Sequence, residues 1–275
     1  MNYVYQGIKE ILYELLLSKL PIRQRFFRVL FRFQNLRRIM RKYHDIKFSV
    51  DNKSICQVSD NLKNYGYSVS HIDINSELLD EVHSLKYKED VSNKFFDSYD
   101  DVINYKGIRE HSRYVANNCH LDSNEILKLS NNPEIKKIVK NYLGDKAELK
   151  ASVCWVSMSE VLDSNNFEFG FHMDISNWKW LNVFINLSEV LIENGPHSCI
   201  EKTHEKRHFS SFLERRLGYN RAISIYGESR IKIFTGPVGT AIFEDTGNYH
   251  RALPIISGHR LMLQLNYSNY NNFDI

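Results

Sequence analysis

The stretch Arg260–Tyr267 reads RLMLQLNY, and its residues alternate between two chemical kinds. Every second position from Arg260 to Asn266 is Arg, Met, Gln or Asn, whereas the positions between them are all leucine. Successive side chains of a strand point to opposite faces, so this pattern predicts a β-strand with one largely polar face and one apolar face. We expect the polar face to line the inside of a barrel that contains a functional site, and the leucines to lie beneath covering helices.

The chain from about residue 148 onward contains further strand-like runs, separated by turn signals rich in Gly, Pro and Asn. These runs are Leu149–Met158, Trp178–Leu187, Ser198–Glu201, Ile231–Ile233 and Gly239–Phe243. Many short strands without long helices between them predict an antiparallel sandwich or barrel and not a parallel α/β sheet. The fold class is therefore mainly β with flanking helices.

The region before the strands predicts a mixture of elements. Helices are expected at Ser59–Tyr65, Asn75–Leu85, Asp122–Asn131 and Pro133–Leu143, and a short strand at Gly66–Ile72. Gly144 is placed to end the last of these helices. Residues 87–120 carry little periodic signal, which predicts long loops with short helical pieces.

Residues 1–45 predict a basic amphipathic helical extension on a domain of residues 46–275, whose barrel core covers about 148–270. Residues 1–42 contain ten Lys or Arg and two Glu, a charge of +8, so the net +3 leaves −5 for the remainder. Three interpretations compete for this helix: packing against the core, attachment to an anionic membrane surface, and binding of a partner. Nucleic acid is disfavoured, because no recognisable reading module follows.

Composition excludes several classes of protein. Apolar residues at 43% and charged residues at 25% are typical of a globular domain. The four cysteines form no C-x-x-C pair, which argues against a zinc site, a redox dithiol or a disulfide framework. No signal-peptide pattern or membrane-length apolar run is present. We expect a cytoplasmic protein, with the inner face of the membrane as an alternative location; the oligomeric state stays open.

A candidate metal site lies in the segment Phe169–Asp174, FGFHMD. His172 and Asp174 are two residues apart, and such positions share one face of a strand. A further histidine, His250, follows a turn at the start of another apolar run. Two imidazoles and one carboxylate form the facial ligand set of non-haem iron(II) oxygenases, which leaves positions open for a co-substrate and dioxygen.

Arg260 strengthens this interpretation. His-x-Asp alone is weak evidence in a chain with 11 histidines, because chance matches are common. Arg260 follows His250 by ten residues and belongs to the polar face described above. Its planar guanidinium can bind a carboxylate with two hydrogen bonds, so it suits a dicarboxylate held on the metal. A core histidine or an ion-paired arginine would each be ordinary alone, but their joint pattern favours a site.

In this order and spacing, the motifs resemble the phytanoyl-CoA dioxygenase family of double-stranded β-helix oxygenases over about residues 55–270. The matching segments are Leu62–Tyr67, Asn132–Gly144, His172–Asp174, Glu193–His204 and Asp245–Arg260. Two departures stand out. Lys202 and Thr203 replace the small pair that usually precedes the histidine of the fourth segment, and Met173 stands where a polar residue is common.

The resemblance implies a double-stranded β-helix, a jelly-roll or cupin-like barrel. It implies Fe(II) bound by His172, Asp174 and His250 as the catalytic centre, with 2-oxoglutarate and O2 as co-substrates. Arg260 would hold the far carboxylate of 2-oxoglutarate. Two more residues, Asn182 and Trp155, are candidates for the second 2-oxoglutarate contact, which no motif identifies. His204 either lines the site or braces its loop.

The function implied is hydroxylation of a small or amphiphilic substrate, such as a lipid, a lipid-linked sugar or an acyl conjugate. Peripheral membrane contact through residues 1–45 would suit such a substrate. Two alternatives remain: a catalytically silent barrel that acts as a binding or scaffold protein, and a protein or peptide hydroxylase. Residues 100–120 and 203–230 are expected to form the lid of the substrate pocket.

Overall fold

The computed structural model describes residues 53–89, 94–105, 113–159, 170–174, 180–205, 208, 214 and 216–269. The helical extension expected at residues 1–45 lies outside these ranges and stays a prediction. Within them, no helix is both long enough and apolar enough to cross a lipid bilayer.

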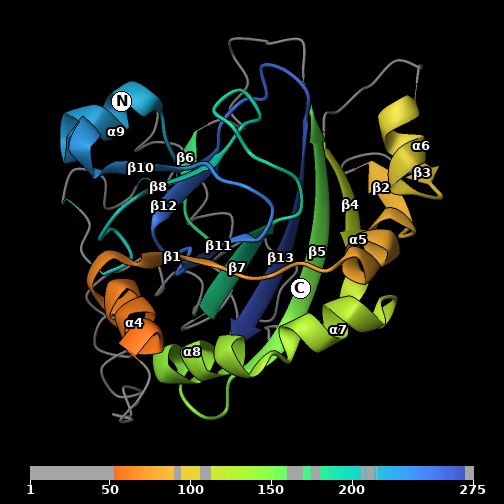
Figure 1. The fold of residues 1–275 in the computed structure, drawn as a ribbon. Helices are drawn as coiled ribbons and strands as arrows, with labels where there is room; N and C mark the ends of the chain where they lie inside the picture. The colour runs from red at the N-terminus through yellow and green to blue at the C-terminus, as the bar shows by residue number, and fades with distance from the viewer. Residues whose placement is uncertain are drawn as a thin grey trace, which may run out of the picture.

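Two antiparallel sheets form the centre of the molecule (Figure 1). The larger sheet has the strand order β1-β11-β7-β13-β5-β4-β2-β3, and the smaller has the order β10-β8-β12-β6-β9. The strands of the larger sheet are β1 (Tyr67–His71), β2 (Tyr87–Glu89), β3 (Phe95–Phe96), β4 (Arg113–Asn117), β5 (Glu148–Met158), β7 (Trp180–Asn186), β11 (Thr240–Glu244) and β13 (His259–Ser268). Those of the smaller sheet are β6 (Phe171–His172), β8 (His197–Ile200), β9 (Arg216–Leu217), β10 (Ile231–Phe234) and β12 (Tyr249–Ala252).

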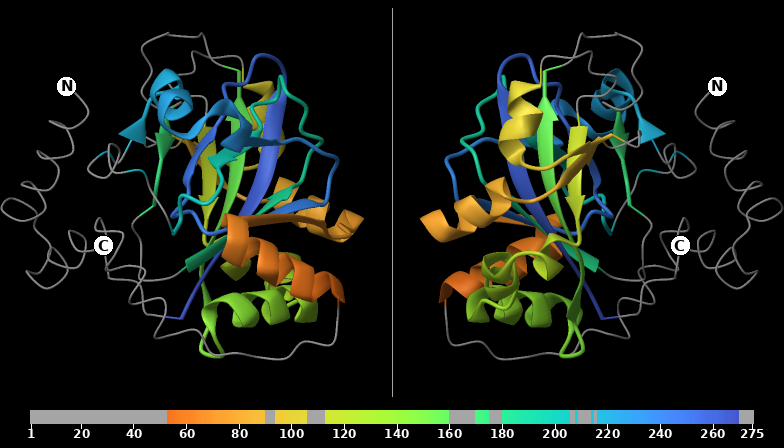
Figure 2. Two further views of the ribbon diagram at one scale, coloured as in Figure 1. Left: turned by 90° about the vertical axis from the view of Figure 1, so that its left-hand side faces the viewer. Right: turned by 90° about the vertical axis from the view of Figure 1, so that its right-hand side faces the viewer.

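Helices cover the outer side of the larger sheet, as Figures 1 and 2 show from three directions. These helices are α4 (Lys53–Tyr65), α5 (Ser76–His83), α6 (Tyr99–Asn104), α7 (Asn124–Ser130) and α8 (Pro133–Leu143). The helix α9 (Tyr219–Tyr226) packs instead against the smaller sheet, and two 3-10 turns, η2 (Cys119–Leu121) and η5 (Glu228–Arg230), complete the described helical elements. The helix α8 shows why these segments fold locally. Pro133 occupies its first turn, the Asn132 side chain accepts from two free backbone N–H groups, and Gly144 ends it with φ 99°.

The alternation of β13 is observed as expected. Leu261, Leu263 and Leu265 belong to the main apolar core, which joins the outer face of the larger sheet to the helices. Met262, on the other face, packs in a smaller cluster with residues of both sheets, including Phe184 of β7. The two sheets therefore face each other across an interior that Arg260, Met262 and their neighbours line. The expected fold class, a mainly β barrel with flanking helices, is confirmed.

The region 87–120 contains short helical pieces as expected, α6 and η2, but it also contains strands where loops were expected. Arg113–Asn117 forms β4, which pairs antiparallel with β5 over five residues and with β2 on its other side. These residues are thus part of the barrel wall and not of a lid. The sequence signal was weak because three consecutive residues in the middle of β4 are buried, so the strand has no alternation of polar and apolar positions.

Candidate metal centre

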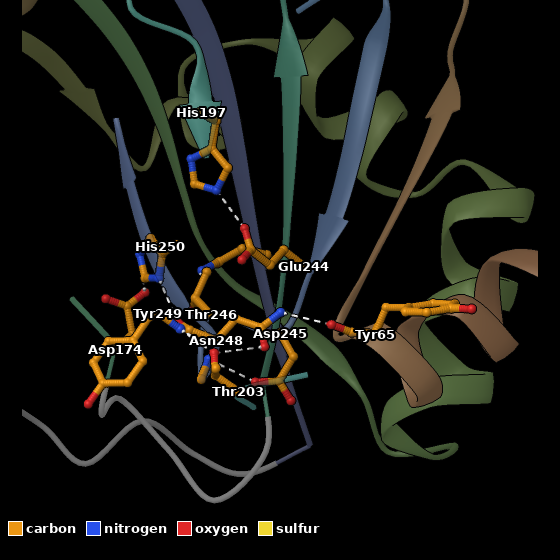
Figure 3. A network of polar contacts seen from close by, with 12 residues as sticks. Tyr65, Asp174, His197, Thr203, Glu244, Asp245, Thr246, Asn248, Tyr249 and His250 are labelled. Carbon is orange, nitrogen blue, oxygen red and sulfur yellow. Dashed lines mark hydrogen bonds and ion pairs between the residues drawn. The ribbon is translucent and has the colours of Figure 1, made fainter. Parts of the chain in front are cut away.

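Three potential metal ligands meet at one end of the barrel interior. His172 of β6 and His250 of β12 are directly opposite each other in the register of the smaller sheet. Asp174 follows β6 by two residues, so its side chain is on the same side as that of His172. One ligand atom from each residue lies within 4.8 Å of the other two. Figure 3 shows the carboxylate of Asp174 beside the ring of His250.

Hydrogen bonds set the orientation of both imidazoles. His172 Nδ1 lies 3.4 Å from the carbonyl oxygen of Gly170, and His250 Nδ1 lies 3.1 Å from that of Asn248. A ring that donates from Nδ1 keeps its lone pair on Nε2, where a metal binds. Burial, helped by the neighbouring His250, lowers the pKa of His172 to about 3. The imidazole is therefore neutral near pH 7, as a metal ligand must be.

The turn before His250 holds the two ligand-bearing segments together. The Asp245 carboxylate accepts from the Tyr142 hydroxyl at 2.7 Å and from the backbone N–H of Gly247 at 2.9 Å. The carbonyl oxygen of Thr246 accepts from the backbone N–H of Asp174 at 3.0 Å. Because this bond links the loop of one ligand to the turn of another, it fixes Asp174 relative to His250.

The segment that ends at His204 braces this turn from outside. The Asn248 side-chain oxygen accepts from the His204 backbone N–H at 2.7 Å, and the His204 ring lies 3.3 Å from the carbonyl oxygen of Lys63. Gly66 is required here, because its φ is 81° and a Cβ would lie 2.4 Å from the Asn248 amide. Lys202 adopts the left-handed region with φ 67°. The Lys202 backbone N–H donates to the carbonyl oxygen of Tyr65 at 2.8 Å, so these two backbone segments approach closely although Lys202 and Thr203 are not small. His204 stabilises the turn through its contacts with Asn248 and Lys63.

Arg260 lies on the inner face of β13 with only 4% of its surface exposed. Its Nη1 donates to the carbonyl oxygen of Gly195, whereas its Nε has no hydrogen-bond partner among the described residues. Ser157, directly opposite in β5, has a buried hydroxyl that likewise has no partner in that part of the chain. Burial, together with the positive charge of Arg113, lowers the pKa of Arg260 to about 10. An anion bound in the interior would therefore pair with the Arg260 guanidinium and accept a hydrogen bond from the Ser157 hydroxyl.

Asn182 and Trp155 occupy the interior, but both side chains are already engaged. Asn182 donates to the Thr246 hydroxyl at 2.9 Å and accepts from the Asn266 amide at 2.7 Å. Trp155 donates its indole N–H to Gln264 at 3.0 Å. Because an indole has a single donor, Trp155 has none left for a ligand in this arrangement.

A buried pair that sequence reasoning missed joins the two sheets inside the barrel. His197 Nε2 of β8 and Glu244 Oε2 of β11 are 2.5 Å apart, and Figure 3 shows this contact beside the candidate ligands Asp174 and His250. The rings of His197 and His250 are 5.7 Å apart between centroids. Burial raises the pKa of Glu244 to about 8 and lowers that of His197 to about 3. The only sequence signal was that Glu244 continues the inward phase of β11.

No protein-family model matches the chain, and no curated protein matches it either. Solved structures do resemble it. The non-haem α-ketoglutarate-dependent epimerase SnoN from nogalamycin biosynthesis has a TM-score of 0.54 at 14% identity, with 82% of this chain and 88% of that chain covered. For EctD from S. alaskensis with bound Fe, the values are 0.54 and 16%, covering 82% of this chain and 81% of that chain.

A third similar structure is HygX from Streptomyces hygroscopicus with nickel, 2-oxoglutarate and hygromycin B bound. It has a TM-score of 0.50 at 12% identity, and 77% of this chain and 86% of that chain are covered. At such low identity these likenesses establish the fold alone. This chain therefore has the jelly-roll barrel fold that SnoN, EctD and HygX share.

Proposed function

We propose that this chain is an Fe(II)- and 2-oxoglutarate-dependent oxygenase. The observation that carries the proposal is the convergence of His172, Asp174 and His250 within 4.8 Å, in a barrel whose inner wall also presents the buried Arg260. A metal triad alone would suit many metals and reactions. A triad combined with an inward cation that lacks a carboxylate partner among the described residues suits a dicarboxylate that bridges the two.

The residues present fit Fe(II). Two imidazoles and one carboxylate, without a thiolate, favour a hexacoordinate metal with open positions over a closed tetrahedral zinc site. Both Nε2 atoms are left for the metal by the Nδ1 contacts. Asp174 is partly exposed, at 33% of its side chain, so it lies where a substrate can approach from outside.

The residues of this chain would bind and orient the metal and the co-substrate. Arg260, with the Ser157 hydroxyl opposite, would hold the far carboxylate of 2-oxoglutarate, and the triad would hold Fe(II). When bound, Fe(II), 2-oxoglutarate and dioxygen supply the oxidation that removes a hydrogen atom from the substrate. The apolar walls from Phe184 and Met262 exclude water from this space.

The substrate we propose is a small molecule. The support is by analogy of fold: a SnoN structure contains nogalamycin RO and a HygX structure contains hygromycin B. Hydroxylation is the outcome we favour, although the similar structures also include an epimerase and a carbocyclase. An amphiphilic substrate reached from a membrane surface is the narrower version of the proposal, and it depends on the basic character of residues 1–45.

Anaerobic titration tests the co-substrate directly. Adding 2-oxoglutarate to the Fe(II)-loaded protein should produce a weak visible charge-transfer band, and Asp174→Ala should abolish it. Asp97→Asn, which alters an exposed carboxylate beyond β3, should leave it unchanged. Absence of the band in the wild-type protein would contradict the proposal. A band without succinate release in air would favour the silent binding barrel.

Vesicle co-sedimentation tests the membrane-facing version. The full chain should partition onto vesicles that contain anionic lipid more strongly than a chain without residues 1–45. Equal partitioning of both forms would leave a freely dissolved small molecule as the substrate, while the oxygenase proposal itself would be unaffected.

A further inference from the structure

The interior pair His197 and Glu244 has no part in binding the metal as described above, yet it lies beside the metal centre. Both side chains are buried, His197 at 5% and Glu244 at 0% exposure. They come from different sheets, so their 2.5 Å contact spans the barrel interior. Burying two ionisable groups in an apolar cluster carries a large desolvation cost, which makes a purely space-filling role for them unfavourable.

His197 lies close to both the candidate metal centre and Arg260. Its ring packs at 5.7 Å from that of His250, and both Asp174 and Arg260 act electrostatically on it. The backbone carbonyl that accepts from Arg260 belongs to Gly195, two residues before His197. A dicarboxylate that extends from the metal to Arg260 would therefore pass the imidazole.

The hydrogen bond to Glu244 determines which nitrogen of His197 is available. Nε2 is the atom that contacts Glu244, and the ring makes no other hydrogen bond to a residue that the structure describes. Figure 3 shows the second ring nitrogen turned away from Glu244. Because both groups are buried, a net charge on the pair is unfavourable, and an uncharged pair at this distance has the Glu244 carboxyl donating to Nε2. A neutral imidazole that accepts at Nε2 has its hydrogen on Nδ1.

We propose that His197 donates a hydrogen bond from Nδ1 to a carboxylate of the bound 2-oxo acid, and that Glu244 is the positioning residue that holds this tautomer. The inference rests on the proposed function, since it assigns a second contact to the same co-substrate. It places that contact at His197, because Trp155 and Asn182 are engaged by Gln264, Thr246 and Asn266.

The test is anaerobic titration of the Fe(II) protein with 2-oxoglutarate. His197→Leu should raise the Kd of 2-oxoglutarate by roughly 10- to 100-fold, the effect of one hydrogen bond to a charged group. His197→Asn, whose amide reaches the Nδ1 position, should recover most of the affinity. Glu244→Gln, which still donates to Nε2, should bind about as well as the wild type, whereas Glu244→Leu should not. Leu263→Met is the matched control, because it alters a buried side chain on the helix-covered face of the same sheet and removes no donor.

A second readout does not depend on variants that fold. In the Zn(II)-loaded wild-type protein, the 15N resonance of His197 Nδ1 should be that of a protonated nitrogen and should shift when 2-oxoglutarate is added. An unshifted resonance under saturating 2-oxoglutarate would overturn the inference, as would an unchanged Kd in His197→Leu. Equal weakening of Fe(II) and 2-oxoglutarate binding would also overturn it. Failure of the wild type to bind 2-oxoglutarate at all would instead count against the proposed function.

Discussion

Replacement of Arg260 by methionine should stabilise the ligand-free protein and remove its response to 2-oxoglutarate. The guanidinium is almost fully buried, and its Nε has no hydrogen-bond partner within the described part of the chain. Methionine has a similar length and no charge, so it can fill the same space beside the interior cluster. The substitution should therefore raise the stability of the ligand-free protein and, at the same time, remove the binding of 2-oxoglutarate.

The magnitude follows from the pKa. Burial lowers the pKa of Arg260 from 12.5 to about 10, and at 1.36 kcal/mol per unit this corresponds to a penalty of roughly 3 kcal/mol. Methionine also leaves the Gly195 carbonyl without its donor, which costs about 1–2 kcal/mol. The net gain is about 1 kcal/mol, or an increase in Tm of about 2–4 °C for a domain of this size.

Thermal unfolding with and without saturating 2-oxoglutarate, in the presence of Ni(II), measures both effects. At a concentration 100 times its Kd, the ligand should stabilise the wild type by about 2.7 kcal/mol and the variant by almost nothing. The order of the two melting temperatures should therefore reverse when 2-oxoglutarate is added. Arg260→Lys, which retains the charge without the planar fork, should melt near the wild type and respond weakly. A ligand-free Arg260→Met protein that loses about 3–5 kcal/mol, as when a buried ion pair is broken, would refute the reasoning.

Three further predictions concern the surroundings of the site. Lys202→Gly should raise the free energy of unfolding by about 0.5–1 kcal/mol in urea titrations, because the residue has φ 67°; a loss would show that contacts of the lysine outweigh the strain. Thr246→Val should lower it by about 2–3 kcal/mol, because an indole and an amide donor lose their acceptor; Thr246→Ser is the control that should retain most of it. In the metal-free wild type, stability should fall by up to about 1.4 kcal/mol per pH unit between pH 6.5 and 8. The pKa of Glu244 is raised to about 8, so between pH 6.5 and 8 the folded state keeps a proton that the unfolded state has lost. The lowered pKa values of His172 and His197 affect stability only below pH 6.5. Glu244→Gln should flatten this slope, and an unchanged slope would exclude Glu244 as its source.

The parts of the fold that were predictable are those with strong local signals. The helix α8 has the predicted bounds, Pro133–Leu143, because its cap, first-turn proline and terminal glycine all act within the segment. The strand β13 was predictable because period-two alternation continues through it. The strand β4 was missed because its five residues depend on neighbours in the sheet and not on their own pattern.

The residues of the candidate site also differ in how strongly local sequence signals identify them. His172 and Asp174 share a face through local spacing, and Arg260 was identified by its phase in a strand. His197 and Glu244 lie at the outer limits of their strands, and the predicted strands Ser198–Glu201 and Gly239–Phe243 stopped one residue short of each. A one-residue difference in a strand boundary decides whether such a side chain is assigned to a loop or to the interior. Contacts between different sheets leave no spacing in the sequence, so only the structure brings this pair together.

The sequence identity to proteins of the same fold is low, and a physical reason is that the site requires particular residues at only a few positions. The triad needs the β6–β12 register, which places His172 opposite His250, and a turn that ties Asp174 to Thr246 through backbone atoms. The same turn makes hydrogen bonds to backbone groups of Tyr65 and Gly66, which precede β1, and of His204 in the loop after β8. Lys202, in that loop, adopts the left-handed conformation although it is not a small residue. We expect interior positions such as 197 and 244 to change together, because each buried polar group needs a partner. Differences in co-substrate and substrate recognition are therefore expected to arise from such interior pairs, while the metal centre and the barrel that supports it stay the same.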